Sequence, residues 1–442
     1  MIRRIFLYCL LIVLGSSCTK QNFNKPRLDS LLTSLQGNNK AMGSLAISVD
    51  GQVIYSRSFG YRSINGNEKI APDSHTKYRI GSISKMFTAT MIFQLIEEGK
   101  LKLNDRLANW FPELPNAQKI TIGNMLNHRS GLYNFTNDAA YWPYSTQPCA
   151  EAEMTAIFAK QKPDFEPDEK AEYSNTNFVL LGYIIERITK KAYSEELKER
   201  IVSKIGLNDT YYGGKTNVKN NEAHSYVFAV KWMQMEETDM SIPGGAGAII
   251  STPTDLTKFI EALFAGKLIR MDHLNLMKTL NDNYGMAMFE TDFDGKKGYG
   301  HDGGIDLFRS TLTYFPDQKL AIAYCSNSGA YNFDKVKEAG LSIYFHKPFT
   351  FPEFKTSPLK PEVLDKYLGV YSTKQTSFKI TITKNNSTLI AQGTGQPQFV
   401  LEPVAQDRFI VSELGAISDF EPSKNRFVLE QGDSEMYFTK DK

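Results

Sequence analysis

The sequence predicts an α+β protein in two parts: an antiparallel sheet flanked by helices with an inserted helical subdomain, and a small all-β barrel. Strand patterns occur at both ends of the first part, and helical and loop patterns dominate between them. A proline-rich stretch then precedes a series of short strand patterns. A length of 442 residues fits two domains.

Composition supports an ordinary folded protein and excludes several classes. A hydrophobic content of 41% supports a sizeable core, and 23% charged residues argue against wholesale disorder. Lys plus Arg (51) nearly balance Asp plus Glu (49), so no global charge favours nucleic acid. Four cysteines exclude a disulfide-built scaffold, and six scattered histidines without a Cys-x-x-Cys pair predict no metal site. We expect no cofactor.

Residues 1–18 have the pattern of a secretory signal. Two arginines precede an apolar run over 5–14, which is too short for a mature transmembrane helix, and small residues then lead to Cys18. Leu14-Gly15-Ser16-Ser17-Cys18 resembles a relaxed bacterial lipobox, so we expect a lipidated Cys18, a membrane anchor and a location in the cell envelope. The alternative is an ordinary cleaved signal. The polar segment 19–40 is expected to be a tether leading into a first helix.

The domain over 41–346 begins with strand patterns, and strand patterns return near its end before a closing helix. Alternating residues around Asp50-Gly51 predict a hairpin over 43–59. Apolar residues lie almost all round the helix predicted over 83–101, so this helix should be buried. Further patterns are two helices over 177–189 and 254–265, two strands over 307–315 and 320–324, and a closing helix over 334–345. This order predicts one antiparallel sheet built from both ends of the segment.

A linker over 347–361 contains four prolines, which disfavour helix and sheet. The following segment, 362–442, carries short strand patterns separated by turn residues. Such spacing predicts a small sandwich or barrel. The expected strands lie at 367–371, 378–383, 388–392, 399–403, 408–412, 427–430 and 436–439.

The first candidate site motif is Ser82-Ile83-Ser84-Lys85, which opens the apolar helix. Residues three apart on a helix are neighbours, so Lys85 can reach the Ser82 hydroxyl. A hydroxyl needs a neighbouring base to become a good nucleophile, and burial can lower a lysine pKa enough for that role. The alternative is a helix cap with a solvated lysine. Other Ser-x-x-Lys copies without such a helix occur at Ser17–Lys20, Ser74–Lys77 and Ser357–Lys360.

Two further motifs add polar groups suited to the same chemistry. Tyr173-Ser174-Asn175 places a proton-shuttling hydroxyl and a substrate-orienting amide two residues apart; the alternative is a turn that caps the following helix. Gly300-His301-Asp302-Gly303-Gly304 enters a strand, where glycines let a ligand approach the backbone. His301 can hydrogen-bond a substrate carboxylate or the tyrosine, and Gly304 N–H can join Ser82 N–H as an oxyanion hole. The alternative is a Gly-rich hairpin turn.

Taken together and in this order, the three motifs resemble the serine β-lactamase and penicillin-binding superfamily, in the branch of class C β-lactamases, D-peptidases and related esterases. The resemblance covers about residues 40–346, and the segment from about 360 is similar to a small β-barrel appended to some D-peptidases. Supporting stretches are His128-Arg129-Ser130-Gly131-Leu132, 180–186 and 251–256.

The resemblance implies a β-lactamase/transpeptidase-like fold and a serine hydrolase that forms an acyl-enzyme on Ser82. Lys85 and Tyr173 would share general-base duty and protonate the leaving group. The expected substrates are D-amino-acid-containing peptides or small esters and amides. Substrate would be positioned by Asn175, His301, Gly303 and Gly304.

Two departures from the family pattern bear on substrate and loop structure. Asp168 follows Pro167 where the family usually has glycine, which alters that loop. His301 replaces the lysine of dedicated class C β-lactamases, and a largely neutral histidine grips a β-lactam carboxylate less firmly. This favours peptide or ester substrates. Two alternatives remain open: a β-lactamase that hydrolyses antibiotics, and a penicillin-binding sensor or interaction protein with little turnover.

Overall fold

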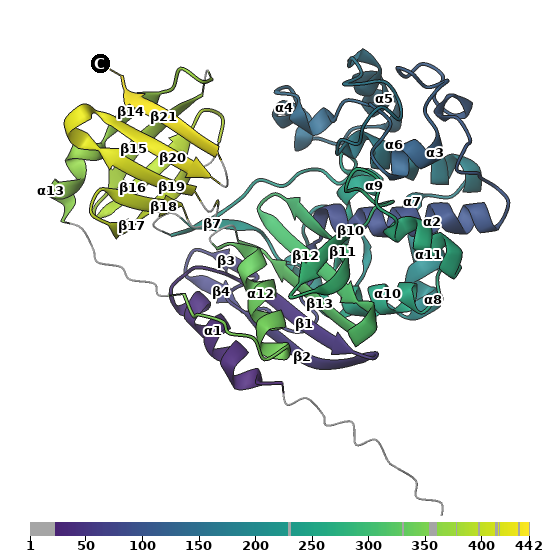
Figure 1. The fold of residues 1–442 in the computed structure, drawn as a ribbon, viewed down its shortest axis with the longest axis horizontal. Helices are drawn as coiled ribbons and strands as arrows, with labels where there is room; N and C mark the ends of the chain where they lie inside the picture. Colours follow the sequence, from purple (N-terminus) through teal and green to yellow (C-terminus); the bar gives the residue numbers. More distant parts are fainter. Residues whose placement is uncertain are drawn as a thin grey trace, which may run out of the picture.

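The computed structural model describes residues 23–228, 231–328, 331–352, 360–376, 378–396, 398–411, 414, 416–431 and 434–441. A central sheet with helices on both faces is joined to a separate barrel, drawn in yellow at the left of Figure 1. The predicted α+β architecture with a C-terminal all-β barrel is confirmed. The expected signal over 1–18, with Cys18, and residues 353–359 of the expected linker lie outside the described residues.

The central sheet is antiparallel and six-stranded, in the order β10-β11-β12-β13-β1-β2. Strand β1 pairs with β13, so the two ends of the domain meet in the middle of the sheet, as the sequence predicts. Asp50 and Gly51 both have positive φ values, which two-residue hairpin turns of this kind require. The strands are β1 (Gly43–Val49), β2 (Gln52–Phe59), β10 (Phe289–Phe293), β11 (Lys296–Ile305), β12 (Phe308–Phe315) and β13 (Leu320–Ser326).

The sheet separates two hydrophobic cores. Helix α10 (Pro253–Phe264) packs against one face, and α12 (Phe333–Tyr344) packs against the other together with α1 (Lys25–Gly37). The segment expected to be a tether over 19–40 therefore differs from that expectation: most of it is α1. Its four leucines recur at helical spacing and are buried under the sheet, at positions 28, 31, 32 and 35.

Helices fill the insert between β2 and β10. Helix α2 (Ser84–Glu97) is buried from Ser84 to Leu95, as its nearly continuous apolar surface predicts. It ends four residues before the predicted end. Helix α6 (Asn175–Thr189) and the short α9 (Gly244–Gly247) lie against it. The remaining helices are α3 (Ile122–Leu126), α4 (Tyr141–Ser145), α5 (Glu151–Lys160), α7 (Tyr193–Leu197), α8 (Ser203–Ile205) and α11 (Met271–Lys278).

Short strand pairs complete this domain. They are β3 (Ser63–Asn65) with β4 (Glu68–Ile70), β7 (Tyr226–Phe228) with β8 (Trp232–Gln234), and a small sheet of β5 (Tyr78–Arg79), β9 (Ile249–Ser251) and β6 (Tyr211–Tyr212).

The C-terminal domain is a closed barrel of eight strands, in which β14 pairs with both β15 and β21. The seven predicted strands are present, and the prediction missed β19. A short helix, α13 (Pro361–Leu364), precedes the barrel. The strands are β14 (Gly369–Ser372), β15 (Lys379–Asn385), β16 (Thr388–Gly393), β17 (Gln398–Ala405), β18 (Arg408–Val411), β19 (Ala416–Glu421), β20 (Arg426–Gln431) and β21 (Ser434–Lys440).

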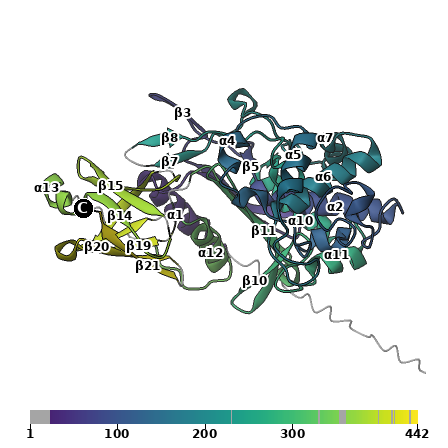
Figure 2. The same ribbon diagram turned by 90° about the horizontal axis from the view of Figure 1, so that it is seen from above.

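The barrel meets the first domain through the β7–β8 hairpin, which lies between the two bodies in Figure 2. Strand β17 contacts β7, and Glu402 of β17 forms an ion pair with Lys40. Within the described ranges, no helix is long and apolar enough to cross a membrane.

Candidate active site

Ser82 lies in one turn of 3₁₀ helix, η1 (Gly81–Ile83), which leads directly into α2. Gly81 has a φ of +50°, and a Cβ atom on it would lie 2.7 Å from the backbone nitrogen of Gly304 in β11. The left-handed backbone and the close approach therefore both require glycine at this position. A Cβ on Gly303 would likewise lie 3.0 Å from the nitrogen of Ser82. The glycines of β11 thus let the strand pass directly beside a partly exposed Ser82.

Lys85 follows one turn later and is fully buried. Its Nζ lies 3.0 Å from Ser82 Oγ, 2.8 Å from Asn175 Oδ1 and 2.8 Å from the carbonyl oxygen of Ala246. The two amide oxygens can only accept hydrogen bonds, so they take both N–H groups of a neutral amine and leave its lone pair for the Ser82 hydroxyl. Burial lowers the pKa of Lys85 well below the usual lysine value, which favours this neutral form.

Tyr173 and Asn175 reach the site from the start of α6, where Ser174 is the N-cap. The Tyr173 ring centroid lies 4.9 Å from Lys85 Nζ. Burial raises the pKa of Tyr173, and a hydrogen bond with Ser82 only partly offsets this effect. The phenol therefore keeps its proton at neutral pH. It can pass a proton between Ser82, Lys85 and a leaving group, whereas the amine of Lys85 is the available base.

Asn175 is held in place by two residues that sequence reasoning did not identify. Its backbone N–H donates to Asn134 Oδ1 at 3.0 Å, and its Nδ2 donates to Thr136 Oγ1 at 3.1 Å. These bonds turn Oδ1 toward Lys85 Nζ. Nothing in the local pattern around 134–136 distinguishes it from an ordinary polar loop, so only the fold reveals this role.

His301 is 5% exposed and its ring centroid lies 6.1 Å from that of Tyr173. Its Nδ1 is close enough to the carbonyl oxygen of Asp302 to donate a hydrogen bond, which leaves Nε2 as an acceptor. Burial, helped by the nearby Lys85, lowers the pKa of His301 to about 3. A neutral ring with a free acceptor cannot donate to a carboxylate. It can accept a hydrogen bond from Tyr173, which is the second of the two roles considered from the sequence. It can also accept one from a substrate N–H.

His128 is a further residue of the site that sequence reasoning did not assign, although its stretch supported the family resemblance. It is 1% exposed, and its ring lies 4.4 Å from that of Tyr173. Its Nδ1 accepts a hydrogen bond from the backbone N–H of Ser174 at 3.1 Å. His128 therefore fixes both the backbone and the ring at the start of α6.

Asp168, where the family pattern usually has glycine, lies in a left-handed turn. Its φ is +71°, a conformation that Asp tolerates better than most residues with a side chain. Its Oδ1 accepts from Arg129 Nε at 2.6 Å, and its backbone N–H donates to the Arg129 carbonyl oxygen at 2.8 Å. At this departure from the family pattern, the loop has a left-handed residue whose side chain forms an ion pair with Arg129.

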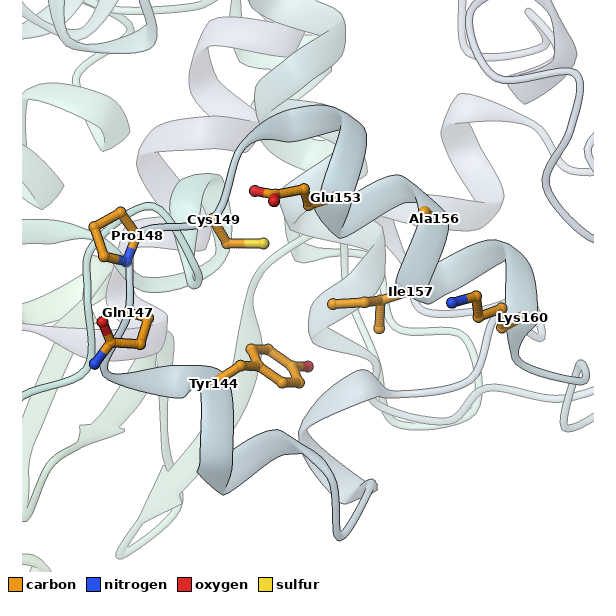
Figure 3. A pocket seen from close by; sticks show the side chains of 8 residues that line it. All are labelled: Tyr144, Gln147, Pro148, Cys149, Glu153, Ala156, Ile157 and Lys160. Atoms are coloured by element: carbon orange, nitrogen blue, oxygen red, sulfur yellow. The ribbon is translucent and has the colours of Figure 1, made fainter.

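A cavity of about 410 Å³ lies away from these residues, between α4 and α5 (Figure 3). None of the predicted site residues lines it, so it does not form part of the candidate site. Its walls are Tyr144, Gln147, Pro148, Cys149, Glu153, Ala156, Ile157 and Lys160. Among the described residues, no group of three or more His, Cys, Asp or Glu side chains is placed to hold a metal ion.

Comparison with known proteins shows the family to which the chain belongs. The family model for beta-lactamase matches residues 28–343, which is most of the chain. The chain belongs to the beta-lactamase family. The similarity of this family member to penicillin-binding protein 4* of Bacillus subtilis (strain 168) extends through the barrel, at 27% identity over 94% of this chain and 98% of the relative.

Two solved structures extend the comparison. The D-amino acid amidase from Ochrobactrum anthropi SV3, complexed with L-phenylalanine amide, is 26% identical with a TM-score of 0.62, covering 72% of this chain and 99% of that chain. The octameric penicillin-binding protein homologue from Pyrococcus abyssi covers 94% of this chain and 100% of its own, with 23% identity and a TM-score of 0.63. The second likeness shows the fold, including the barrel. The protein is thus a serine hydrolase of the β-lactamase and penicillin-binding superfamily.

Proposed function

We propose that the protein hydrolyses amides or peptides with a D-amino-acid acyl group, and small esters, through an acyl-enzyme on Ser82. The observation that carries this proposal is the buried amine of Lys85, which lies 3.0 Å from Ser82 Oγ and 2.8 Å from each of two amide oxygens. In the neutral amine, the two amide oxygens accept both N–H groups, and the lone pair is left for the Ser82 hydroxyl. A serine hydroxyl next to such a base is activated for attack on a carbonyl carbon.

The proposed reaction has two halves. Ser82 Oγ attacks the substrate carbonyl and its proton passes to Lys85, while the backbone N–H groups of Ser82 and Gly304 hold the developing oxyanion. Lys85 then returns the proton through Tyr173 to the leaving nitrogen or oxygen, which departs and leaves an ester on Ser82. Water attacks this ester and gives a proton to Lys85. The bond from the acyl carbon to Ser82 Oγ then breaks, the acid departs, and Lys85 returns the proton to Ser82 Oγ. Asn175 and His301 position the substrate.

Two observations support amides and esters over β-lactam antibiotics. His301 is neutral and presents an acceptor, so it offers a β-lactam carboxylate neither charge nor a proton. Both the amidase from Ochrobactrum and a D-stereospecific amidohydrolase from Streptomyces, 27% identical with a TM-score of 0.60, act on D-configured substrates by their names.

A panel of four substrates tests this proposal: D-phenylalanine amide, L-phenylalanine amide, p-nitrophenyl acetate and the β-lactam nitrocefin. We expect the D-amide and the ester to be hydrolysed and the L-amide to react at least about tenfold more slowly. Preference for the L-amide, or no hydrolysis of any of them, would contradict the proposal. Fast nitrocefin turnover would favour a β-lactamase, and a stable β-lactam adduct without turnover would favour a sensor.

The pH dependence of hydrolysis should follow the protonation of Lys85. The amine must be neutral to act as a base, so kcat/KM should rise with pH through a Lys85 pKa well below the usual lysine value. His301, with a pKa of about 3, should add no transition near pH 6.5. We expect a single-proton acid limb with its midpoint well below the usual lysine pKa. Activity that appears only above about pH 10 would show an ordinary, unshifted lysine.

We also propose that Cys18 is lipidated and anchors the enzyme in the cell envelope, a proposal that rests on the sequence pattern before Cys18. Several acyl chains on one cysteine suffice for stable membrane attachment, where a single chain is marginal. Cys18→Ser should therefore move the protein from the membrane to the soluble fraction. Intact mass spectrometry of the membrane-extracted wild type checks this: a mature N-terminus other than Cys18, or one without acyl mass, would indicate an ordinary secreted enzyme.

A further inference from the structure

The edge of β11 beside Ser82 is the place where a substrate must lie. Strand β10 pairs with β11 only as far as Gly300, opposite Phe289. From His301 to Ile305, no strand of the described residues pairs with this edge. The free edge runs past Tyr173 at its start and past the turn of Ser82 near its end.

The chemistry fixes the direction in which a substrate occupies this edge. The leaving group takes its proton from Tyr173, so it must lie toward His301, whose ring neighbours that of Tyr173. The reacting carbonyl lies at the N–H groups of Ser82 and Gly304. The acyl group therefore extends the other way, beyond Gly304, and residues on the two sides of the scissile bond can be assigned separately.

Arg309 lies on the acyl side. It is opposite Gly304 in the register of β11 and β12, and its Nη1 lies 2.8 Å from the point where a Cβ of Gly304 would be. The guanidinium is partly buried, and burial lowers the Arg309 pKa. Within the described part of the chain it makes no ion pair, and Nη1 donates one hydrogen bond to the carbonyl oxygen of Phe308 at 3.1 Å.

This arrangement leaves a partly buried cation beside Gly304, without an ion pair in the part of the chain that the structure describes. A guanidinium has five N–H donors in a fork that matches a carboxylate, so most of its hydrogen-bonding capacity is unused here. Removing such a charge from water is unfavourable unless a partner compensates it. A carboxylate on a bound ligand would supply that partner.

Asp302 carries the opposite charge on the leaving-group side. Its side chain is 48% exposed and lies on the same face of the sheet as Arg309, because Asp302 pairs with Thr311 and Gly304 with Arg309. Lys337 is its nearest cation, at 3.8 Å, but this lysine lies closer to Asp334, at 3.1 Å. A leaving group with a free carboxylate would meet the negative charge of Asp302.

We propose that Arg309 binds a carboxylate on the acyl group, so that the enzyme prefers acidic D-acyl residues, and that Asp302 disfavours leaving groups with a free carboxylate. This inference rests on the proposed function, of which it names the substrate class. It predicts an amidase or endopeptidase for acidic D-residues that is inefficient at removing a C-terminal residue with its free carboxylate.

The test compares D-glutamyl p-nitroanilide with D-glutaminyl p-nitroanilide, which have the same shape and differ in one charge. For the full-length wild type we expect kcat/KM to favour the glutamyl substrate by about tenfold or more, the range of a hydrogen-bonded ion pair. In Arg309→Gln this ratio should fall to about one, and in Arg309→Glu it should fall below one. Arg408→Gln, an exposed arginine of the barrel, should keep the wild-type ratio.

The outcomes separate this inference from the proposed function. Turnover of the glutaminyl substrate, abolished by Ser82→Ala, reports on the proposed function alone. If the wild type hydrolyses the glutaminyl substrate and its glutamyl-to-glutaminyl ratio of kcat/KM is near one, the role of Arg309 is refuted and the proposed function stands. This outcome is measured on the wild type alone, so it does not depend on the folding of a variant. If neither anilide is hydrolysed while p-nitrophenyl acetate is, both the D-acyl specificity and the role of Arg309 are refuted.

Discussion

Replacing Ser82 with alanine is expected to lower kcat for every amide and ester substrate by about 10⁴-fold or more. Of the hydrogen bonds that Lys85 Nζ makes within the described residues, only the one with Ser82 involves a hydroxyl, and the substitution removes it. Because Ser82 lies at the surface of the site and loses a single oxygen, the fold should be retained. Steady-state kinetics together with a thermal unfolding curve check both parts of the expectation.

Ser74→Ala is the matched control for this experiment. Ser74 opens another Ser-x-x-Lys copy, but it is exposed, and its lysine, Lys77, forms an ion pair with Asp209 at 3.2 Å. This variant should therefore have wild-type activity. A folded Ser82→Ala enzyme that still turns over substrate would refute the nucleophilic role of Ser82.

Lys85→Met is the second change with a large expected effect, a loss of roughly 10²- to 10⁴-fold in kcat. Methionine fills a similar volume without a base. It leaves Asn175 Oδ1 and the Ala246 carbonyl oxygen without this donor, which is unfavourable, but it also removes a buried amine. We therefore expect a folded protein with a modest change in its unfolding temperature.

The control for Lys85→Met is Lys100→Met, which replaces a lysine that is 52% exposed and paired with Glu98 at the surface. It should leave both kcat and its pH dependence unchanged. If Lys85→Met kept wild-type kcat, Tyr173 or another group would have to be the base. A variant with low kcat but an unchanged acid limb would show that Lys85 does not set the pH dependence.

Most of what the sequence predicts about the site concerns residues that are close together in the chain. Ser82 and Lys85 are one helical turn apart, so their meeting follows from a local rule. The same holds for Tyr173 and Asn175, two residues apart at a helix start. By contrast, the carbonyl of Ala246 and the ring of His128 reach the site from distant segments, and only tertiary packing places them there.

The fold shows the same division between local pattern and packing. The hairpin at Asp50-Gly51 and the buried helix α2 follow from turn chemistry and apolar periodicity. Strand β19 was missed because its inward positions include the small Ala416 and the polar Ser418, while Ile417 points outward, which weakens the expected alternation. The sequence predicts a tether where the structure has helix α1, because the polar residues of this segment obscure four leucines at helical spacing.

Trapping the covalent intermediate tests the central claim most directly. The enzyme is mixed with a slowly turned-over ester or a β-lactam, quenched in acid, and analysed by intact and peptide mass spectrometry. The account predicts a mass increase equal to the acyl group, located on the peptide that contains Ser82, present in the Ser74→Ala control and absent from Ser82→Ala. Turnover without any adduct under conditions where deacylation is slow, or an adduct on a different residue, would contradict it.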